Sequence, residues 1–304
     1  MCIRDSLDAV DPEAWPRVLG RIAGEPALRR ALVDPVRGES SALAPSYTSW
    51  WLRERSELGL GRPFAVGDRL SALLPAAPDA VAHLDASVQR ALGGVASLEE
   101  LDGAGWTHLL DAWGPIGVPV DPELAVAVWR SMAPDEPPER LPAVVGPGRV
   151  AVVHAEDAAV ADHPMWYQRT DVAALLPGTE ATAALLDLPF AGDLADGAVT
   201  SGGEVDDVPV DVRTLLPDAP DTWVQHDDLL VDGAPVDWWV EDSVVHAVHL
   251  AGLAAGLAQA AGRWDLRYAV EVLLTAPDRA AEIALDVVEG GRREGRLSDL
   301  SGSG

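Results

Sequence analysis

The side chains with the clearest capacity for chemistry gather in residues 223–264, a stretch rich in tryptophan, histidine and aspartate. Its candidate ligands and acid–base groups are His226, Asp227, Asp228, Asp242, His246 and His249. Imidazole nitrogens and carboxylate oxygens are common zinc ligands, so a metal site built from His226, Asp228, His246 and His249 is one hypothesis. The alternative is that these histidines pack or cap, because the spacing is not HExxH.

The pattern around these residues predicts strand, turn, strand and then a long apolar helix. Residues 224–231 and 235–240 are the expected strands, and Asp232-Gly233 is a dipeptide that suits a hairpin turn. The expected helix covers residues 244–261 and ends at Gly262. His246 and His249 would then share one helix face. Asp227 and Asp228 would point to opposite faces of their strand, which weakens the metal hypothesis.

Other routes to catalysis find little support in the sequence. No GxSxG elbow occurs, and the only cysteine is Cys2. Gly252 and Gly256 have GxxxG spacing, which in a helix indicates close packing rather than a phosphate loop. We therefore expect no catalytic residue, no cofactor-binding residue and no metal ligand within this chain.

Composition excludes further classes of function. The 304 residues include no Lys and no Asn, so a P-loop lysine, a Schiff base and Asn-linked glycosylation are impossible. The net charge of −27 disfavours nucleic acids and anionic membranes as partners. No apolar run reaches the roughly 18 residues of a membrane span, and no signal peptide is visible. A cytoplasmic setting is expected.

The chain is expected to have an α+β fold in two parts. Helical periodicity over residues 63–134, with capping signals at Ser97 and Asp121, predicts a mainly helical region over residues 7–132. Residues 133–142 hold four prolines and read as a linker. A mixed α/β domain over residues 143–289 would pack the hairpin on the long helix, and residues 290–304 would form a disordered tail.

Two further expectations concern the first sixty residues. Residues 1–6, MCIRDS, look like translated sequencing-adapter sequence, so the natural chain is expected to extend upstream. Trp50 and Trp51 lie in a helix that starts near Ser46. Neighbouring residues on a helix point about 100° apart, so one of these tryptophans should lie at a boundary.

Two stretches together carry a family resemblance: DPVRGESSALAPSYTSWWLR, residues 34–53, and HDDLLVDGAPVDWW…GLAAGLAQAAGRW, residues 226–264. They resemble the C-terminal region of large actinobacterial proteins that carry a sacsin N-terminal ATPase-like domain. These proteins are described as molecular chaperones of the ninety-kilodalton heat-shock type. The similarity covers nearly the whole chain after residue 6.

The resemblance implies that the activity belongs to a GHKL-type ATPase domain preceding this region. That domain's nucleotide site uses an acidic residue and an asparagine on one helix, a DxGxG loop and a glycine-rich lid, none of which is present here. ATP and Mg²⁺ are therefore expected only in the missing domain of the parent. The expected partners are that upstream ATPase domain, client proteins or a second copy of the chain.

Three functions follow. The first is a non-catalytic middle and C-terminal region of a sacsin-like ATP-binding protein, serving client contact, dimerisation or coupling to the ATPase. The second is a metal-dependent enzyme using the cluster of His226, Asp228, His246 and His249. The third is a stand-alone protein-interaction module.

Overall fold

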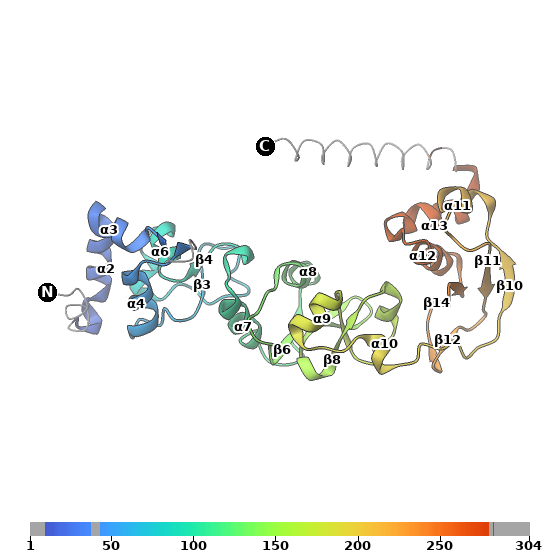
Figure 1. Ribbon diagram of the computed structural model, residues 1–304, viewed down its shortest axis with the longest axis horizontal. Coiled ribbons are helices and arrows are strands. Elements are labelled where there is room, and N and C mark those ends of the chain that lie inside the picture. The colour runs from blue at the N-terminus through green and yellow to red at the C-terminus, as the bar shows by residue number, and fades with distance from the viewer. Residues whose placement is uncertain (1–9, 38–42, 280–281, 283–304) are drawn as a thin grey trace. The chain divides into compact units, whose positions relative to one another are not determined.

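The computed structural model describes residues 10–37, 43–279 and 282 (Figure 1). The fold is α+β, as expected, with short helices and several small mixed sheets. Within the described ranges, no helix combines the length and the apolarity needed to cross a bilayer. The expected adapter-like segment, residues 1–6, and the expected tail, residues 290–304, lie outside the described residues.

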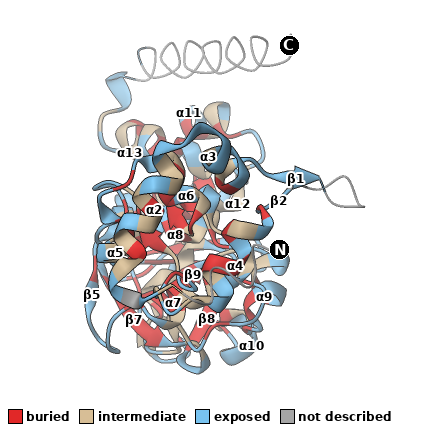
Figure 2. Ribbon diagram, turned by 90° about the vertical axis from the view of Figure 1, so that its left-hand side faces the viewer, coloured by how far each residue is buried: buried red, intermediate tan, exposed pale blue. Residues whose placement is uncertain are grey.

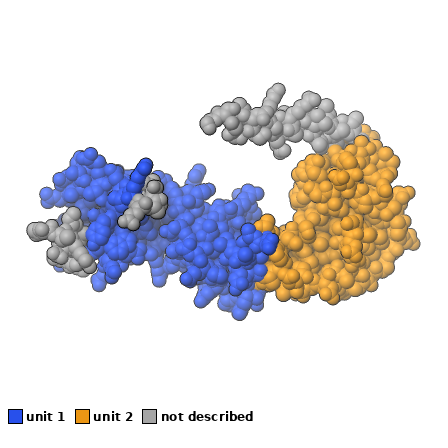
Figure 3. All heavy atoms as spheres, viewed as in Figure 1, with its two compact units in different colours: residues 1–143, 150–157, 180–188 blue, residues 144–149, 158–179, 189–304 orange. Residues whose placement is uncertain are grey.

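The chain divides into two compact units (Figure 3). Unit 1 comprises residues 1–143, 150–157 and 180–188, and unit 2 comprises residues 144–149, 158–179 and 189–304. The first boundary adjoins the expected linker at residues 133–142. Residues 140–142 of that expected linker lie in strand β6 (Arg140–Gly146). A proline at position 142 did not prevent this strand, since proline is tolerated where its missing N–H is not needed by the ladder.

Unit 1 is mainly helical. Its helices are η1 (Pro12–Ala14), α2 (Trp15–Gly24), α3 (Pro26–Val33), α4 (Tyr47–Arg55), α5 (Asp79–Ala82), α6 (Ala86–Ala91), η2 (Leu98–Glu100), α7 (Gly103–Asp111), α8 (Pro122–Ser131), η3 (Ala155–Asp157) and α9 (Glu180–Leu186). Its short strands are β1 (Val36–Arg37), β2 (Leu43–Ala44), β3 (Phe64–Ala65), β4 (Gly94–Val95) and β5 (Pro119–Val120). Strand β5 pairs with β7 (Arg149–His154), and β6 and β7 supply residues to both units.

The core of unit 1 forms between α2, α3, α4 and α6. Trp51 is buried in it and its ring centroid lies 6.4 Å from that of Trp15, whereas Trp50 remains 42% exposed. The prediction that one of the adjacent tryptophans lies at a boundary is confirmed. Ser46 caps α4 by accepting a hydrogen bond from the Ser49 N–H, also as expected. Strand β1, by contrast, is exposed along its length (Figure 2).

The helical prediction for residues 63–134 was partly wrong. Residues 66–74, which follow β3, form bends and turns rather than a helix. Ser97 starts only the three-residue η2, and its side chain makes no capping hydrogen bond. Helix α7 begins later, where the carboxylate of Asp102 accepts from the Gly105 N–H. Asp121 does cap α8, so the local signal was reliable where aspartate preceded proline.

Unit 2 contains most of the strands. They are β8 (Ala158–Ala161), β9 (Ala174–Pro177), β10 (Glu204–Asp207), β11 (Thr222–Gln225), β12 (Leu230–Val231), β13 (Ala234–Pro235), β14 (Trp238–Glu241) and β15 (Val244–Ala247). Its helices are η4 (Pro164–Gln168), α10 (Ala191–Leu194), α11 (Val210–Leu215), α12 (Leu250–Ala260), η5 (Trp264–Leu266), α13 (Arg267–Thr275) and η6 (Pro277–Arg279).

A four-stranded sheet in the order β10-β11-β15-β14 organises unit 2. Strands β11 and β15 are parallel, with Val224 opposite His246, and both outer pairs are antiparallel. The sheet packs with α12 and α13 around a core that includes Trp223, Trp238, Val245 and Leu257. A second core joins β8, β9 and the β12–β13 ribbon around Trp166 and Trp239.

The stretch that we expected to be one hairpin and one helix is more divided. The Asp232-Gly233 turn is confirmed, with φ of 50° and 83°, but it joins only the short strands β12 and β13. A second turn at Asp242-Ser243, with φ of 48° and 67°, joins β14 to β15. The expected helix over residues 244–261 is therefore corrected to a strand, β15, followed by α12. The hairpin that packs on the helix is β14–β15.

Helix α12 lies very close to this hairpin because two of its residues have no side chain. A Cβ at Gly252 would lie 2.7 Å from the carbonyl oxygen of Asp237, and one at Gly256 would lie 2.5 Å from Cγ1 of Val245. The GxxxG spacing thus marks close packing, as expected. The helix also ends as predicted, since Gly262 has the positive φ of 63° that suits the position after a C-cap.

Candidate functional site

The structure brings two of the candidate residues, His226 and His246, into direct contact. His226 follows β11, and its N–H donates to the carbonyl of Ala247, which extends the parallel pairing with β15. This register places Nε2 of His226 2.9 Å from Nδ1 of His246. Both imidazoles are buried, with residue exposures of 2% and 8%. The two rings face each other through one hydrogen bond.

The hydroxyl of Ser201 extends this pair into a chain of hydrogen bonds. Its Oγ lies 3.2 Å from Nδ1 of His226 and accepts the N–H of Leu230 at 3.0 Å. One assignment of protons fits both hydrogen bonds: Ser201 donates to Nδ1 of His226, and Nε2–H of His226 donates to Nδ1 of His246. Because His226 is nearly inaccessible to solvent, the arrangement joins loop 199–203 to the sheet rather than presenting a nucleophile to a substrate.

Buried His246 should make unit 2 sensitive to mild acid. Burial lowers the pKa of His246, with a smaller contribution from neighbouring His226 that outweighs the opposing effect of Glu241. Between about pH 7.5 and 5.5 the unfolded chain takes up a proton that folded His246 resists, so the free energy of unfolding should fall over that range. Denaturant unfolding at both pH values should show a smaller loss in His246→Gln. The exposed-histidine variant His163→Gln should keep the wild-type loss, and an unchanged loss in His246→Gln would contradict the assignment.

The other candidate ligands have separate roles. His249 is the N-cap of α12, where its Nδ1 accepts the Gly252 N–H at 2.9 Å, and its Nε2 lies 3.8 Å from Asp237. His246 and His249 do not share a helix face, because His246 lies on β15. Asp242 forms the β14–β15 turn. Across the described parts of the chain, no group of three or more His, Cys, Asp or Glu side chains could hold a metal ion.

Asp227 and Asp228 line a cavity of about 640 Å³ in unit 2. They lie in a bend between β11 and β12, so the expectation that they occupy a strand and point to opposite faces was wrong. A third carboxylate, that of Asp237, lines the same cavity. No basic residue is among the described residues that line it. Three aspartates therefore line one cavity.

Apart from Gln168, the rest of the cavity wall is apolar and aromatic. Leu229 and Val236 are buried, and Pro235 and Val248 lie alongside them. Tyr167 contributes its ring, and burial raises the pKa of its hydroxyl to about 12. An aromatic ring beside carboxylates suits a cationic side chain whose charge is attached to an apolar methylene chain.

Gln168 fixes one wall of this cavity. Its Oε1 accepts the N–H groups of Asp237 and Trp238 at 2.8 and 3.4 Å, and its Nε2 donates to the Trp238 carbonyl at 2.8 Å. The amide thus pairs with the start of β14 in the way that a neighbouring strand would. This contact holds η4, which carries Tyr167, against the strand end that carries Asp237.

A buried arginine holds the β12–β13 turn. Arg169 is only 4% exposed; its Nε and Nη2 donate to Asp171 at 2.9 and 3.0 Å, and its Nη1 donates to Asp232 at 3.0 Å. Burial raises the pKa of Asp232, but hydrogen bonds from Arg169 and from the N–H groups of Ala198 and Gly197 outweigh it, so the pKa is lowered. The ribbon that follows Asp227 and Asp228 is therefore fixed.

Sequence reasoning pointed to Asp227 and Asp228 but missed Tyr167, Gln168 and Asp237. Their one local signal was the aromatic cluster in residues 165–167 beside a glutamine. The contact between Gln168 and Trp238 spans seventy residues of sequence, and no pattern within either segment encodes it.

Comparison with known proteins adds no assignment. No protein-family model matches the chain, and no match appears among the curated proteins or the solved structures.

Proposed function

We propose that this chain is a protein-interaction region that binds a basic segment of a partner protein in the cavity of unit 2. The observation that carries the proposal is that three aspartates, Asp227, Asp228 and Asp237, line one cavity together with apolar and aromatic residues. An arginine side chain fits this chemistry, because its methylene stem packs on Leu229 and Val236 while its guanidinium meets the carboxylates. Arginine and carboxylate form paired, charge-assisted hydrogen bonds.

The charge of the whole chain supports the same partner. A net charge of −27 attracts basic segments over a distance of several ångströms and repels acidic ones. The cavity then selects among basic segments, because a bound side chain must fit beside Tyr167 as well as neutralise a carboxylate. Steering and selection thus depend on different features of the molecule.

The resemblance to sacsin-type ATPase proteins gives this proposal a setting. The basic segment would belong to a client protein or to a neighbouring domain of an ATP-binding, chaperone-type parent in the cytoplasm. ATP and Mg²⁺ would act only in that parent's GHKL domain, and the proposal assigns no catalytic step to this chain. Sequencing the gene upstream of codon 7 tests whether the chain belongs to such a parent protein. A reading frame that starts there without a GHKL domain would contradict this part of the proposal.

Binding itself can be tested with a matched pair of peptides. A blocked pentapeptide with a central arginine should bind. Its citrulline counterpart is nearly isosteric but uncharged, and its affinity should be lower by a factor of at least about ten. The triple variant Asp227→Asn, Asp228→Asn, Asp237→Asn should lose a similar factor for the arginine peptide. Isothermal titration calorimetry measures both effects.

A second triple variant separates the cavity from net charge. Glu204→Gln, Asp206→Asn and Asp207→Asn remove the same number of charges from β10, whose residues are all exposed and outside the cavity. This variant should bind the arginine peptide nearly as well as the wild type does. Equal weakening in both triple variants, or equal binding of the citrulline peptide, would refute a specific site.

A further inference from the structure

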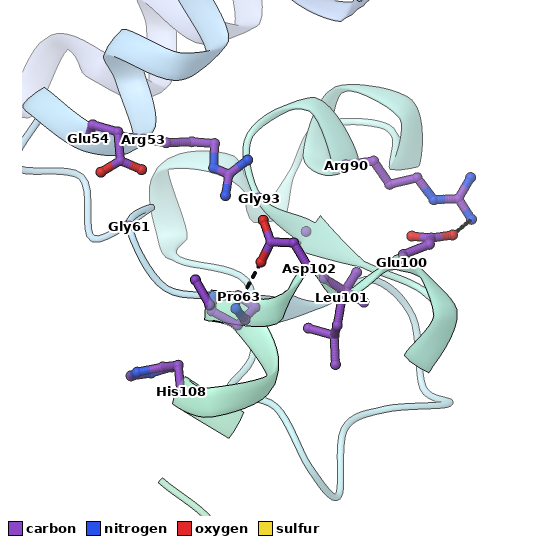
Figure 4. A pocket seen from close by; sticks show the side chains of 14 residues that line it. Arg53, Glu54, Gly61, Pro63, Arg90, Gly93, Glu100, Leu101, Asp102 and His108 are labelled. Carbon is purple, nitrogen blue, oxygen red and sulfur yellow. Dashed lines mark hydrogen bonds and ion pairs between the residues drawn. The ribbon is translucent and has the colours of Figure 1, made fainter. Parts of the chain in front are cut away.

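Unit 1 contains a cavity of its own, of about 440 Å³, between α4, α6 and the start of α7 (Figure 4). The charged and titratable residues in its lining are Arg53, Glu54, Arg90, Glu100, Asp102 and His108. It shares no residue with the acidic cavity of unit 2, and the proposed interaction with a basic segment gives it no role. Unlike that cavity, it contains basic side chains.

Three of these side chains already have partners. Arg90 pairs with Glu100 at 3.1 Å, and Oδ1 of Asp102 accepts the Gly105 N–H at 2.8 Å. Burial lowers the pKa of His108, with a further contribution from Arg62, so its ring is neutral near pH 7. Contacts within the protein therefore account for the positions of Arg90 and Asp102, and no ligand is needed to explain them.

Arg53 is different. It is half-buried near the end of α4, and its Nε is inaccessible to solvent and has no hydrogen-bond partner among the described residues. A buried charged donor without an acceptor is costly, by about 1–3 kcal/mol or more. Figure 4 shows its guanidinium pointing into the cavity, on the side where Asp102 lies. The buried Nε is costly for folding, while the side chain as a whole lines the cavity.

The backbone beside Arg53 leaves room for this guanidinium. Gly93 has a φ of +99°, which side chains other than glycine rarely adopt, and a Cβ there would lie 3.4 Å from Nε of Arg53. The same Cβ would lie 3.1 Å from the Leu60 carbonyl oxygen. Glycine at this position thus keeps the wall of the cavity clear next to the unpaired nitrogen.

We propose that this cavity binds a small zwitterionic monocarboxylate of the free amino-acid type. Its carboxylate accepts from the two terminal nitrogens of Arg53, in the paired arrangement that carboxylates adopt with guanidinium. Its ammonium group faces the carboxylates of Glu54 and Asp102. Those two carboxylates repel polyanions such as phosphate, so a ligand with one charge of each sign matches the lining.

Three related probes separate the two charges of such a ligand. Alanine carries both, propionate lacks the ammonium group, and ethylamine lacks the carboxylate. Each is titrated into the full chain while the backbone amide resonances of Gly93, Gly94 and Gly105 are followed by NMR. Alanine should give saturable shifts, propionate weaker binding and ethylamine none. If propionate binds as strongly as alanine does, the proposal that the ligand is zwitterionic is wrong. If alanine gives no saturable shifts, the proposal that this cavity is a binding site is wrong.

Two matched arginine variants identify the binding residue. Arg53→Met should weaken alanine binding about tenfold or more, which corresponds to a lost charge-assisted hydrogen-bond pair. Arg55→Met changes an exposed arginine on the same helix, which lies over the ring of Trp50 at 5.9 Å, and should bind alanine as the wild type does. Equal affinities in the two variants would overturn the assignment.

Stability gives a second, independent readout. Because the buried nitrogen of Arg53 has no partner in the protein, Arg53→Met should unfold at the same denaturant concentration as the wild type or at a higher one. A residue placed for folding would behave in the opposite way. A large loss of stability in Arg53→Met would therefore contradict the assignment even if binding also fell.

Discussion

Replacing Arg169 with methionine is expected to lower the free energy of unfolding of unit 2 by about 3 kcal/mol or more. The guanidinium is almost entirely buried and donates to both Asp171 and Asp232. Methionine has nearly the same length, so the packing volume is kept while Asp232 loses its charged partner. Urea unfolding, combined with hydrogen exchange over residues 197–241, measures the loss and locates it.

The chain offers a matched control for this variant. Arg263 donates to Asp265 through the same two-residue spacing, with Nε–Oδ1 and Nη2–Oδ2 distances of 3.0 and 2.8 Å, but both side chains are about half exposed or more. Exposed pairs contribute about 0–1 kcal/mol, so Arg263→Met should be nearly neutral. Similar losses in the two variants would show that burial of Arg169 is not the reason for its effect.

Acid should reproduce part of the Arg169 effect. Hydrogen bonds from Arg169 lower the pKa of Asp171, and the pKa of Asp232 is lowered as well. Each carboxylate therefore contributes stability that is complete above the ordinary aspartate pKa of about 3.9 and is lost as the pH falls through the lower folded value. Arg169→Met should show a shallower loss in that range than the wild type does.

Replacing Trp239 with alanine is expected to cost about 3–5 kcal/mol. The side chain is 1% exposed, its ring meets that of Trp166 edge-on at 4.9 Å, and its Nε1 donates to the Gly197 carbonyl at 2.8 Å. Alanine removes the ring, the aromatic contact and the hydrogen bond at once. Denaturant unfolding followed by near-ultraviolet circular dichroism measures the change.

Two further substitutions show how the Trp239 effect divides. Trp239→Phe keeps an aromatic ring but leaves the Gly197 carbonyl without its donor, so it should cost clearly less than alanine does. Trp50→Ala removes a tryptophan that is 42% exposed, and its cost should stay near 1 kcal/mol. If Trp239→Ala were as mild as Trp50→Ala, the second core of unit 2 would not depend on this ring.

The sequence predicted features whose signals are local. The Asp232-Gly233 turn, the Ser46 cap and the end of α12 at Gly262 each depend on a residue type with a strong conformational preference. The Asp242-Ser243 turn was missed because neither residue is glycine, although both have positive φ. That omission extended the expected helix backwards over β15. It also placed His246 on a helix face instead of in a sheet.

The sites were harder to predict than the elements. His226 and His246 meet because β11 and β15 are parallel neighbours, and a parallel pairing between distant strands leaves no local mark in the sequence. Tyr167 reaches the cavity of Asp227 only through the packing of η4 against β14. Arg53 is the clearest example of what the sequence cannot predict. It stands out because its Nε has no hydrogen-bond partner among the described residues, and this can be recognised only in the three-dimensional structure.

The amide of Gln168 has a consequence for how this protein meets other chains. It donates to the outward C=O of Trp238 and accepts from the outward N–H of the same residue. At the other edge of the sheet, the carboxylate of Asp206 accepts from the N–H of Asp207. Both outer strands thus have part of their backbone edge satisfied from within. An incoming strand would have to displace these side chains before it could extend the sheet. The fold thereby disfavours recognition by shared backbone pairing, a mode open to almost any extended peptide, and leaves recognition to side chains, which can tell one partner from another.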